Sequence, residues 1–460
     1  MEEDAGSTPA GLHPRGRTNV DVSAVLRHLG QARELPLDDP GRLRLEHAAL
    51  ALVRDGQRRR RRERERATAR TDAETMAATA MGARDRIADA PVGPPETATE
   101  LRLRKTRTCY VCKAGYDRVH GLYHLLCPAC AAANAARRTA RTDLTGRRAL
   151  VTGGRVKIGH QLALKMLRDG AHVTVTTRFP HDAARRFAEA GDWPGRLSVV
   201  GVDLRDPRQV IALTDRLLEA GDPLDILVNN AAQTIRRPPS AYAVLAEGER
   251  RAAAIALVTG PVAGLPDMSR PLPDVPGLPD LSGPLPDVPG LLPDVSGLLP
   301  DLSPTNSWSA RIGAVDPVEL LETQLVNAVA PFLLIDRLLP LLLASPAERR
   351  YIVNVSAVEG QFAVANKTGR HPHTNMAKAA LNMLTRTSAA DLARQGVHLC
   401  SVDTGWITDE QPAPVRDRLD RRTPLDVIDG AARVYDPIVR GEAGEPVHGV
   451  FLKDYEVAPW

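Results

Sequence analysis

Aromatic side chains are scarce in this sequence: Phe, Trp and Tyr together make up 3% of its 460 residues. The cores must therefore be aliphatic, and aromatic platforms for stacking nucleobases are not expected. An excess of one charge sign is also missing, because 60 Lys and Arg face 56 Asp and Glu and leave a net charge of +4. So small a net charge argues against a protein that binds polyanions over its whole surface.

Targeting and membrane signals are missing as well. The N-terminus, Met-Glu-Glu-Asp, is acidic and has no apolar signal core. The best apolar run, residues 328–344, is broken by Asp336 and Arg337, and no run reaches the roughly 18 apolar residues of a membrane span. We therefore expect a cytoplasmic protein without membrane contact.

Residues 1–104 are polar, rich in Arg and Ala, and expected to be partly helical or disordered. Arg58 to Arg62 form an unbroken arginine run, followed by alternating Glu and Arg. One interpretation is an arm for a nucleic acid or an acidic protein partner. The interpretation we favour is a solvated helix whose Glu and Arg side chains pair three or four residues apart.

Four of the five cysteines form two C-x-x-C pairs, Cys109/Cys112 and Cys127/Cys130, separated by fourteen residues. Four thiolates satisfy the tetrahedral preference of Zn²⁺ and leave no open position for water, so the spacing predicts a structural zinc site. A redox dithiol is the weaker alternative, because one pair would suffice. We expect a zinc-ribbon-like module over residues 105–140, and by analogy its basic surroundings allow contact with a protein or nucleic acid.

Residues 145–460 alternate short apolar runs with helical patterns, which is typical of a parallel α/β sheet. The apolar runs predict seven strands, at 149–152, 172–177, 197–202, 224–228, 351–355, 397–402 and 448–452. A helix is expected from Ile158 to Asp169, with its apolar residues on one face. The predicted fold is a Rossmann-type, doubly wound parallel sheet of about seven strands.

A proline-rich stretch interrupts this alternation. Residues 264–303 repeat variants of Gly-Leu-Pro-Asp, and the frequent prolines exclude both helix and sheet. We expect an insertion at about 258–306. A tolerated surface insertion is the favoured interpretation, and a spacer or a ligand for a partner is the alternative.

A glycine-rich turn follows the first predicted strand, where a backbone without side chains can approach a pyrophosphate at a helix N-terminus. The turn reads Thr152-Gly153-Gly154-Arg155-Val156-Lys157-Ile158-Gly159. It resembles the T-G-x-x-x-G-[IL]-G motif of the short-chain dehydrogenase/reductase family. Four positions match, namely Thr152, Gly153, Ile158 and Gly159, and Lys157 replaces the middle glycine.

Further matches to this family follow in order along the chain. The resemblance implies that Asp203 lies near the adenine and that Asn230 belongs to the turn that closes a strand beside the cofactor. It also implies that Asn327 is the active-site asparagine and that Lys378 holds the nicotinamide ribose. The resemblance spans about 145–455, and it implies hydride transfer with a nicotinamide cofactor.

The preference for one nicotinamide cofactor has a physical basis in the sequence. The second strand ends in Thr177 and Arg178, where a carboxylate would bind the adenosine ribose of NAD. A cationic Arg178 attracts a 2′-phosphate instead, and Arg155 and Lys157 add positive charge at the turn. We therefore expect NADP as the cofactor, in preference to NAD.

Two catalytic residues of the family are missing. Thr374 stands where the family tyrosine is expected, four residues before Lys378, and an aliphatic hydroxyl is a poor base. The family serine aligns with Ala357, whereas Ser356 lies one residue earlier and would point the other way. Imidazole titrates near neutral pH, so His373 beside Thr374 is a candidate replacement for the proton donor.

Two functions from different classes are compatible with these residues. The first is an NADP-dependent oxidoreductase for a small-molecule carbonyl or alcohol, in which Asn327, Lys378, Thr374, His373 and Ser356 form a non-standard active site. The second is an NADP-binding sensor or scaffold that acts through the zinc module and the basic arm. Members of the family are often dimers or tetramers, so homo-oligomerisation is expected by analogy.

Overall fold

The computed structural model describes residues 20–95, 101–259, 292–419 and 421–460. Internal contacts divide the chain into an N-terminal unit, Met1–Thr71, and a C-terminal unit, Asp72–Trp460. This division lies earlier than the boundary expected near residue 104. The reason is that Asp72 and the residues after it belong to the second unit: the Asp72 carboxylate accepts hydrogen bonds from the backbone N–H groups of Arg104 (2.7 Å) and Lys105 (3.2 Å).

The described part of the N-terminal unit contains helix α1, Val22–Ala32, and most of helix α2, Pro40–Ala77. No residue of α1 is buried. The arginine run lies on α2, and Arg61 pairs with Glu65 at 2.9 Å, one helical turn away. Such intrahelical pairs are what the solvated-helix interpretation predicts.

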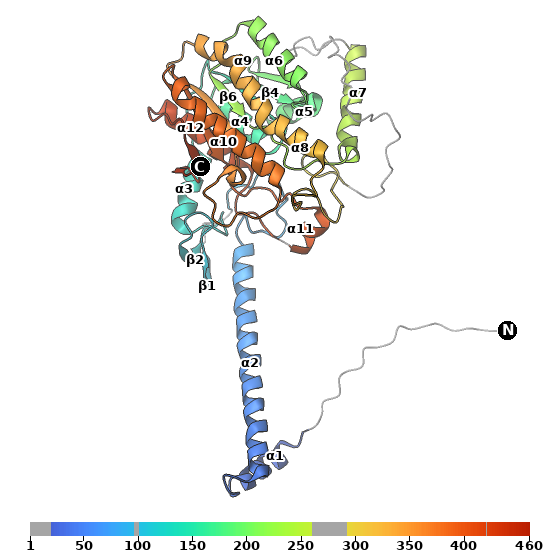
Figure 1. Cartoon of the computed structure of the whole chain (residues 1–460), viewed down its shortest axis with the longest axis vertical. Helices are drawn as coiled ribbons and strands as arrows, with labels where there is room; N and C mark the ends of the chain where they lie inside the picture. The colour runs from blue at the N-terminus through green and yellow to red at the C-terminus, as the bar shows by residue number, and fades with distance from the viewer. Residues whose placement is uncertain (1–19, 96–100, 260–291, 420) are drawn as a thin grey trace, which may run out of the picture. The chain divides into compact units, whose positions relative to one another are not determined.

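The C-terminal unit, in which helices surround the strands (Figure 1), is built on an eight-stranded sheet. The strand order is β10-β9-β8-β7-β6-β3-β4-β5. Its strands are β3 Arg148–Thr152, β4 His172–Thr177, β5 Leu197–Gly201, β6 Ile226–Asn229, β7 Arg350–Ser356, β8 Val397–Asp403, β9 Phe451–Lys453 and β10 Glu456–Ala458. All neighbours pair in parallel except β9 and β10, which are antiparallel. The predicted doubly wound parallel sheet is confirmed, and β10 is an additional strand that the sequence pattern did not indicate.

Helices cover both faces of this sheet. One core cluster joins the strands to α4, α5 and α12, and a second joins them to α6, α9 and α10. The helices of this unit are α3 Pro128–Arg138, α4 Lys157–Arg168, α5 Pro180–Ala190, α6 Pro207–Ala220, α7 Ala243–Thr259, α8 Pro317–Gln324, α9 Ala330–Ala344, α10 Pro372–Ala393, α11 Ala413–Leu419 and α12 Val427–Glu442, with helical turns η1 Pro239–Tyr242, η2 Leu325–Val329 and η3 Val358–Gly360. As expected from the composition, aliphatic side chains dominate both clusters.

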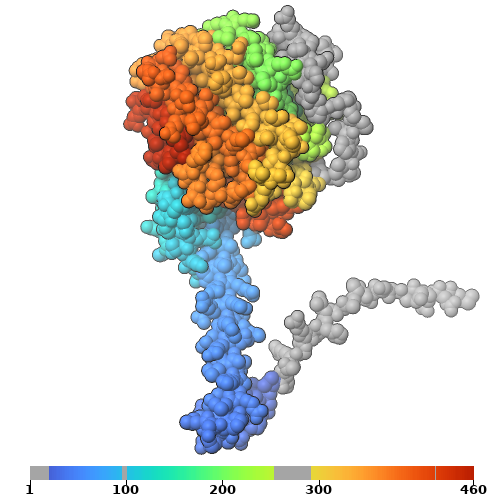
Figure 2. Space-filling model, in the orientation of Figure 1, coloured from blue at the N-terminus to red at the C-terminus, as the bar shows by residue number. Residues whose placement is uncertain are grey.

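The described residues of 72–140, here called the Cys module, pack against the C-terminal part of the sheet domain. The module contains the antiparallel strands β1, Leu101–Thr108, and β2, Gly115–Val119, followed by α3. A third core cluster combines its side chains with Ile407, Leu425 and Val427 of the sheet domain. In Figure 2 the cyan atoms of the module directly adjoin the red and orange atoms of the C-terminal elements.

A buried charge network fixes the module to α12. The guanidinium of Arg138 contacts both carboxylate oxygens of Asp426, at 2.5 and 2.8 Å, and Asp429 at 2.9 Å. Tyr123 donates a 2.6 Å hydrogen bond to Asp429. Burial tends to raise the pKa of Asp426, but the contact with Arg138 outweighs it and lowers the pKa.

Part of the proline-rich insertion, residues 260–291, lies outside the described residues. In the described part, residues 292–303 form neither helix nor strand, as expected. They are nevertheless ordered by hydrogen bonds: the Asp294 carboxylate accepts from the backbone N–H of Ser296 at 2.8 Å, and Ser296 is buried.

The stretch Pro317–Ala344, which spans α8, η2 and α9, is long and apolar enough by composition to cross a membrane. Half of its most apolar window is buried inside the protein. Leu334, Leu338 and Leu342 of this stretch belong to the second core cluster of the sheet domain.

The Arg138 network yields a stability prediction. Replacement of Arg138 by Ala leaves the carboxylates of Asp426 and Asp429 buried without their cation, and such losses cost about 3–5 kcal/mol of unfolding free energy. The matched control is Arg102→Ala, because the Arg102 side chain is 75% exposed and its pair with Asp117 spans 3.0 Å. The control should lose at most about 1 kcal/mol.

Urea unfolding of both variants measures this difference. A loss for Arg138→Ala no larger than that of the control would contradict the structural role of the network. Arg138→Lys, which keeps the charge but not the two-pronged geometry, should fall between the two.

Candidate functional site

The glycine turn connects the carboxyl end of β3 to α4 and leaves no room for side chains at its glycine positions. Gly153 has a φ of +69°, which favours glycine. A Cβ on Gly159 would lie 2.2 Å from the carbonyl oxygen of Gly153, and one on Gly154 would lie 2.6 Å from the side chain of Val175. The turn therefore keeps the bare backbone that a dinucleotide phosphate requires.

Asn230 and Thr152 cross-link the ends of β3 and β6. The Asn230 side-chain amide donates to the carbonyl oxygens of Thr152 (2.9 Å) and Gly153 (3.2 Å). The Thr152 hydroxyl oxygen accepts from the backbone N–H groups of Asn230 and Ala231, both at 3.0 Å. Asn230 thus lies beside the glycine turn, and its role toward a cofactor stays a prediction.

The basic residues of the turn are already paired with acidic groups. Arg155 is buried and donates to Asp182 and to the carbonyl oxygen of Ser296, both at 2.7 Å. The Lys157 ammonium lies 2.9 Å from a carboxylate oxygen of Asp89. The positive charge that the sequence places at the turn is therefore largely neutralised within the protein.

Arg178, at the end of β4, is exposed and stacks over the ring of Tyr242, with 4.7 Å between the guanidinium carbon and the ring centre. Within the described residues no carboxylate pairs with it. The neighbouring Thr177 side chain is buried. Arg178 is thus a cation still available for an anionic ligand beside β4.

Asp203, expected near the adenine, is held by Arg205. Both carboxylate oxygens of Asp203 lie 3.0 Å from Nε of Arg205. Burial tends to raise the pKa of Asp203, but this guanidinium outweighs it and lowers the pKa. The Asp203 carboxylate is therefore ionised, although already engaged.

Asn327 lies in the π-helical turn η2 and is buried. Its side-chain oxygen accepts from the backbone N–H of Gln233 at 2.9 Å, and its amide donates to the carbonyl oxygen of Gln233 at 2.8 Å. These two bonds fix the segment after β6 to the helix that carries Asn327.

Lys378 lies on α10, and its ammonium donates a 2.8 Å hydrogen bond to the carbonyl oxygen of Val355 near the end of β7. Burial lowers the pKa of Lys378 to about 8, although Glu359 opposes the shift. A Cβ on Gly360 would lie 2.5 Å from the backbone of Lys378, so η3 and α10 are in close contact. Lys378 is therefore a buried amine whose pKa lies below the usual value for lysine.

Thr374 precedes Lys378 by one helical turn and shares its helix face. The Thr374 side chain is buried, and its hydroxyl donates a long, 3.4 Å hydrogen bond to the carbonyl oxygen of Thr234. Thr234 follows Gln233, the residue that holds Asn327. The structure thus brings Asn327 and Thr374 to the same segment after β6.

The side chains of His373 and Ser356 have neighbours other than Lys378 and Thr374. Nε2 of His373 lies 4.0 Å from the Glu319 carboxylate of α8, and neither ring nitrogen has a hydrogen-bond partner in the described residues. Burial lowers the pKa of His373, with Glu319 opposing. The Ser356 hydroxyl is buried and donates to Asn382 of α10 at 2.6 Å. Both residues contact helices, and no described bond joins either of them to Lys378.

A segment that carries no known functional motif runs along the carboxyl edge of the sheet. Residues 292–311, here called the strap, are bonded to the glycine turn and to the segments that follow β6 and β8, and reach the start of α10. The bonds run from Arg155 to the Ser296 carbonyl (2.7 Å), Leu299 N–H to Ala241 (3.0 Å), Ala413 N–H to Asp301 (2.8 Å) and His371 N–H to Ala310 (2.8 Å). Sequence reasoning missed the strap, because prolines and aspartates in a repeat carry no signal of where the chain packs.

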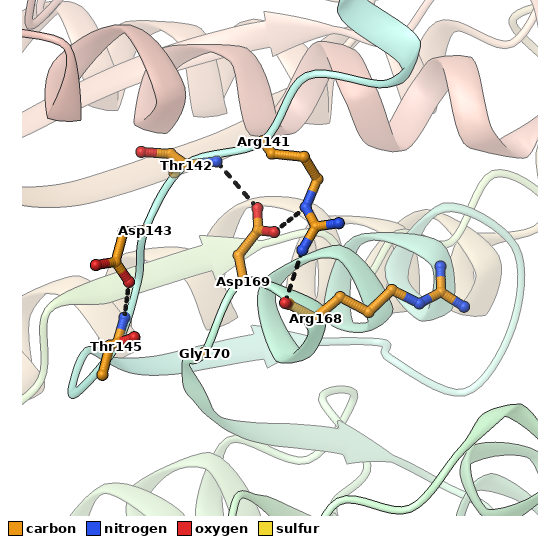
Figure 3. A pocket seen from close by; sticks show the side chains of 7 residues that line it. All are labelled: Arg141, Thr142, Asp143, Thr145, Arg168, Asp169 and Gly170. Atoms are coloured by element: carbon orange, nitrogen blue, oxygen red, sulfur yellow. Dashed lines mark hydrogen bonds and ion pairs between the residues drawn. The ribbon is translucent and has the colours of Figure 1, made fainter.

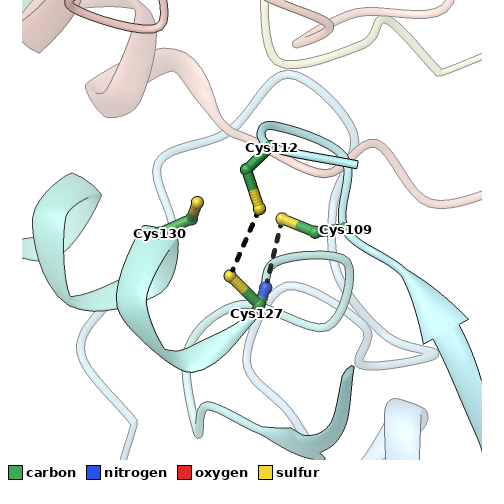
Figure 4. Close-up of side chains that lie close together, drawn as sticks. All are labelled: Cys109, Cys112, Cys127 and Cys130. Atoms are coloured by element: carbon green, nitrogen blue, oxygen red, sulfur yellow. Dashed lines mark hydrogen bonds between the residues drawn. The ribbon is translucent and has the colours of Figure 1, made fainter. Parts of the chain in front are cut away.

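The four cysteines of the two C-x-x-C pairs converge at one point of the Cys module (Figure 4). Their sulfur atoms all lie within 4.8 Å of one another. Burial tends to raise the pKa of Cys109, but backbone hydrogen bonds from Cys127 and Cys112 outweigh it and lower the pKa to about 7. Burial raises the pKa of Cys127 and of Cys130, so the convergence of the four sulfur atoms is what suits the cluster to a metal ion.

A surface cavity of about 430 Å³ lies at the opposite edge of the sheet, before β3 and β4 (Figure 3). Asp169 in its wall is bonded to Arg141 and to the backbone N–H of Thr142. Tyr435 donates to the same carboxylate at 2.6 Å. The polar groups in the wall of the cavity thus hold neighbouring segments of the chain together. The cavity is separate from the glycine turn.

Two family models match the sheet domain. The model for short chain dehydrogenases matches residues 147–249, and the model described as enoyl-(acyl carrier protein) reductase matches residues 302–426. The interval between the two matches contains the proline-rich insertion.

Individual relatives are also similar to this chain in sequence. Uncharacterized protein R665 of Acanthamoeba polyphaga mimivirus is 32% identical over 373 residues, which cover 77% of this chain and 76% of the viral protein. L-xylulose reductase of Mesocricetus auratus is 39% identical over 95 residues, which cover 21% of this chain and 36% of the reductase.

Solved structures also resemble the chain. The NADPH-bound carbonyl reductase from chicken fatty liver has a TM-score of 0.46 and 19% identity, and the match covers 71% of this chain and 98% of that one. Carbonyl reductase Sniffer of D. melanogaster has a TM-score of 0.44 and 20% identity, and the match covers 69% of this chain and 100% of that one. With the glycine turn, Asn327 and Lys378 in order on a doubly wound sheet that two family models match, the chain belongs to the short-chain dehydrogenase/reductase family.

Proposed function

We propose that the chain is an NADP-dependent oxidoreductase that interconverts a small-molecule carbonyl compound and its alcohol. The observation that carries this proposal is the position of Lys378. Its ammonium is buried beside the end of β7 and has no carboxylate within ion-pair distance in the described residues. A buried cation without a counterion is costly, and such groups concentrate at functional sites.

The residues present fit a nicotinamide dinucleotide. The glycine turn and the N-terminus of α4 receive the phosphates, and Arg178 receives a 2′-phosphate. Lys378 holds the ribose next to the nicotinamide. When bound, the cofactor supplies or accepts the hydride, and every proton must come from the protein or the solvent.

Lys378 is the group best suited to carry that proton. The hydroxyl of Thr374 cannot ionise near neutral pH, whereas the pKa of Lys378 is lowered to about 8. In the reductive direction the Lys378 ammonium gives its proton to the developing alkoxide oxygen, with Thr374 relaying it, and the neutral amine regains a proton from solvent. His373 is the alternative donor, and Ser356 orients α10 through Asn382.

Catalysis can be tested with NADPH and a panel of aldehydes, ketones and quinones. Lys378→Ala should lower turnover by about 100-fold or more, since general acid catalysis contributes roughly 10²–10⁴-fold. Because the ammonium is the donor, the wild-type reduction rate should fall as pH rises through about 8. Oxidation of the alcohol should show the opposite trend, since it needs the neutral amine.

Two variants sharpen this test. Lys378→Arg keeps a cation that does not lose its proton near pH 8, so the inflection should disappear. If Lys378 is the donor, the His373→Ala variant should keep the inflection near pH 8. Turnover that survives Lys378→Ala unchanged would contradict the proposed role.

A second candidate function is favoured by one observation: neither Thr374 nor Ala357 supplies the catalytic groups that the family uses. In this alternative the chain binds NADP without turnover and acts through the Cys module and the arginine-rich helix α2, with a protein or nucleic acid as partner. Cofactor binding without turnover of any carbonyl substrate would support it. A homo-oligomer is compatible with both candidates.

The preference for NADP makes a separate prediction. Arg178→Ala removes a charged hydrogen-bond donor worth about 1.5–3 kcal/mol, which should raise the Kd of NADPH by roughly 10-fold or more and leave that of NADH unchanged. The control is Arg208→Ala, since Arg208 is exposed and pairs at 2.9 Å with Asp206, the N-cap residue of α6. Tighter binding of NADH than of NADPH by the wild-type protein would exclude the preference.

We further propose that the four cysteines of the Cys module bind one structural zinc ion. Four thiolates close the coordination shell, so the metal stabilises the module and takes no part in catalysis. Elemental analysis of protein purified without chelator should find one zinc per chain. Cys112→Ser should lose it, whereas Cys400→Ala, at a buried cysteine outside the cluster, should retain it. Metal-free wild-type protein would remove the site.

A further inference from the structure

An ion pair joins the Cys module to the glycine turn. Nζ of Lys157 lies 2.9 Å from Oδ2 of Asp89, and the Asp89 side chain is only 12% exposed. Lys157 stands where the family motif has glycine, and it is the first residue of α4 with a φ of +52°. The pair thus joins the module to the part of the sheet domain where the phosphates are expected.

The Lys157 ammonium has N–H donors that no described contact uses. Its ammonium carries three N–H groups, and the described contacts occupy it only with Asp89. Burial would lower its pKa, but Glu410 and Asp89 outweigh it and raise the pKa. The ammonium is therefore charged and retains capacity for a second anion.

Asp89 is held on a segment with fixed ends. On one side, Arg86 donates to the carbonyl oxygens of Thr423 (2.8 Å) and Leu425 (2.9 Å). On the other side, the backbone N–H of Val92 donates to the Asp426 carboxylate at 2.6 Å. The carboxylate of Asp89 consequently has a defined position relative to the sheet domain.

The same module also contacts Ile158, next to Lys157, and the residues that follow the end of β8. Ile158, which follows Lys157, packs against the core cluster of the module, and Ile407 belongs to that cluster. Tyr110 accepts a 2.8 Å hydrogen bond from the backbone N–H of Trp406. The module is thus in contact with two of the segments that the proposed cofactor site requires.

We propose that Asp89 is a positioning residue of the dinucleotide site, which holds the Lys157 ammonium so that its free N–H donors meet the pyrophosphate. This inference rests on the proposed binding of NADP. A lysine side chain has several rotatable bonds, and fixing it before the ligand arrives reduces the entropy lost on binding. Without Asp89 the ammonium is drawn toward Glu410, the other carboxylate that acts on it.

Direct titration of NADPH into the full-length protein tests this inference. Asp89→Ala should raise the Kd of NADPH about 5- to 10-fold, and Lys157→Gly should have a similar effect. The double variant should bind no more weakly than Lys157→Gly alone, because Asp89 acts through Lys157. Asp89→Asn, which tolerates the φ of +63° at this position, should fall between wild type and Asp89→Ala.

Two further readouts separate positioning from damage to the fold. Adenosine 2′-monophosphate has no pyrophosphate, so its Kd should be unchanged in every variant. If Asp89 strengthens the binding of NADPH, bound NADPH must in turn stabilise the segment that carries Asp89, because coupling between two sites is reciprocal. NADPH should therefore slow hydrogen exchange of the backbone amides at 84–92 in the wild-type protein.

The outcomes are distinct. An unchanged Kd of NADPH in Asp89→Ala overturns the inference, and a lower Kd overturns it as well by showing that Asp89 competes with the phosphates. Weaker binding of adenosine 2′-monophosphate in Asp89→Ala would mean general damage and would also overturn it. If the wild-type protein does not bind NADPH at all, the proposed function fails first.

Discussion

The contact between the two ends of the glycine turn is the constraint on which the rest of the site depends. Gly159 lies so close to the carbonyl oxygen of Gly153 that a Cβ would approach it to 2.2 Å. The Asn230 amide then bonds the same carbonyl and that of Thr152. Because these bonds join β3, β6 and α4, they set where the N-terminus of α4 points. The position of the proposed phosphate site follows from that direction.

Additions to the family fold surround this turn. The Cys module supplies Asp89 to Lys157, and the strap supplies the Ser296 carbonyl to Arg155. Each addition thus binds one of the two basic residues of the turn. The segments that appeared in the sequence as an independent module and a surface insertion are, in their described parts, in contact with the proposed cofactor site.

The sequence predicted the fold well because its signals are local. Apolar runs gave seven of the eight strands to within a few residues, and the glycine turn follows its strand as expected. Strand β10 was missed, since three residues after a tight turn carry little periodicity. The four cysteines, spaced as two pairs, were expected to meet, and they do.

The sequence could not give the partners of the charged groups. Arg155 and Lys157 were expected to add positive charge at the turn, but nothing in the sequence indicated their pairs with Asp182 and Asp89, which lie 27 and 68 positions away along the chain. The contacts that place Asp72 in the C-terminal unit are of the same kind, because its carboxylate accepts hydrogen bonds from the backbone N–H groups of Arg104 and Lys105, far along the chain. Long-range pairing depends on the folded geometry, which residue patterns do not contain.

The central claim is that the carboxyl edge of this sheet binds a nicotinamide dinucleotide with Lys378 beside its reactive ring. A crystal structure of the protein soaked with NADPH tests it most directly. We expect phosphate density over Gly153 and Gly159 and a ribose hydroxyl within hydrogen-bonding distance of Lys378. Density that places the dinucleotide elsewhere, or a Lys378 ammonium bonded only to Val355 beside a bound cofactor, would contradict the account.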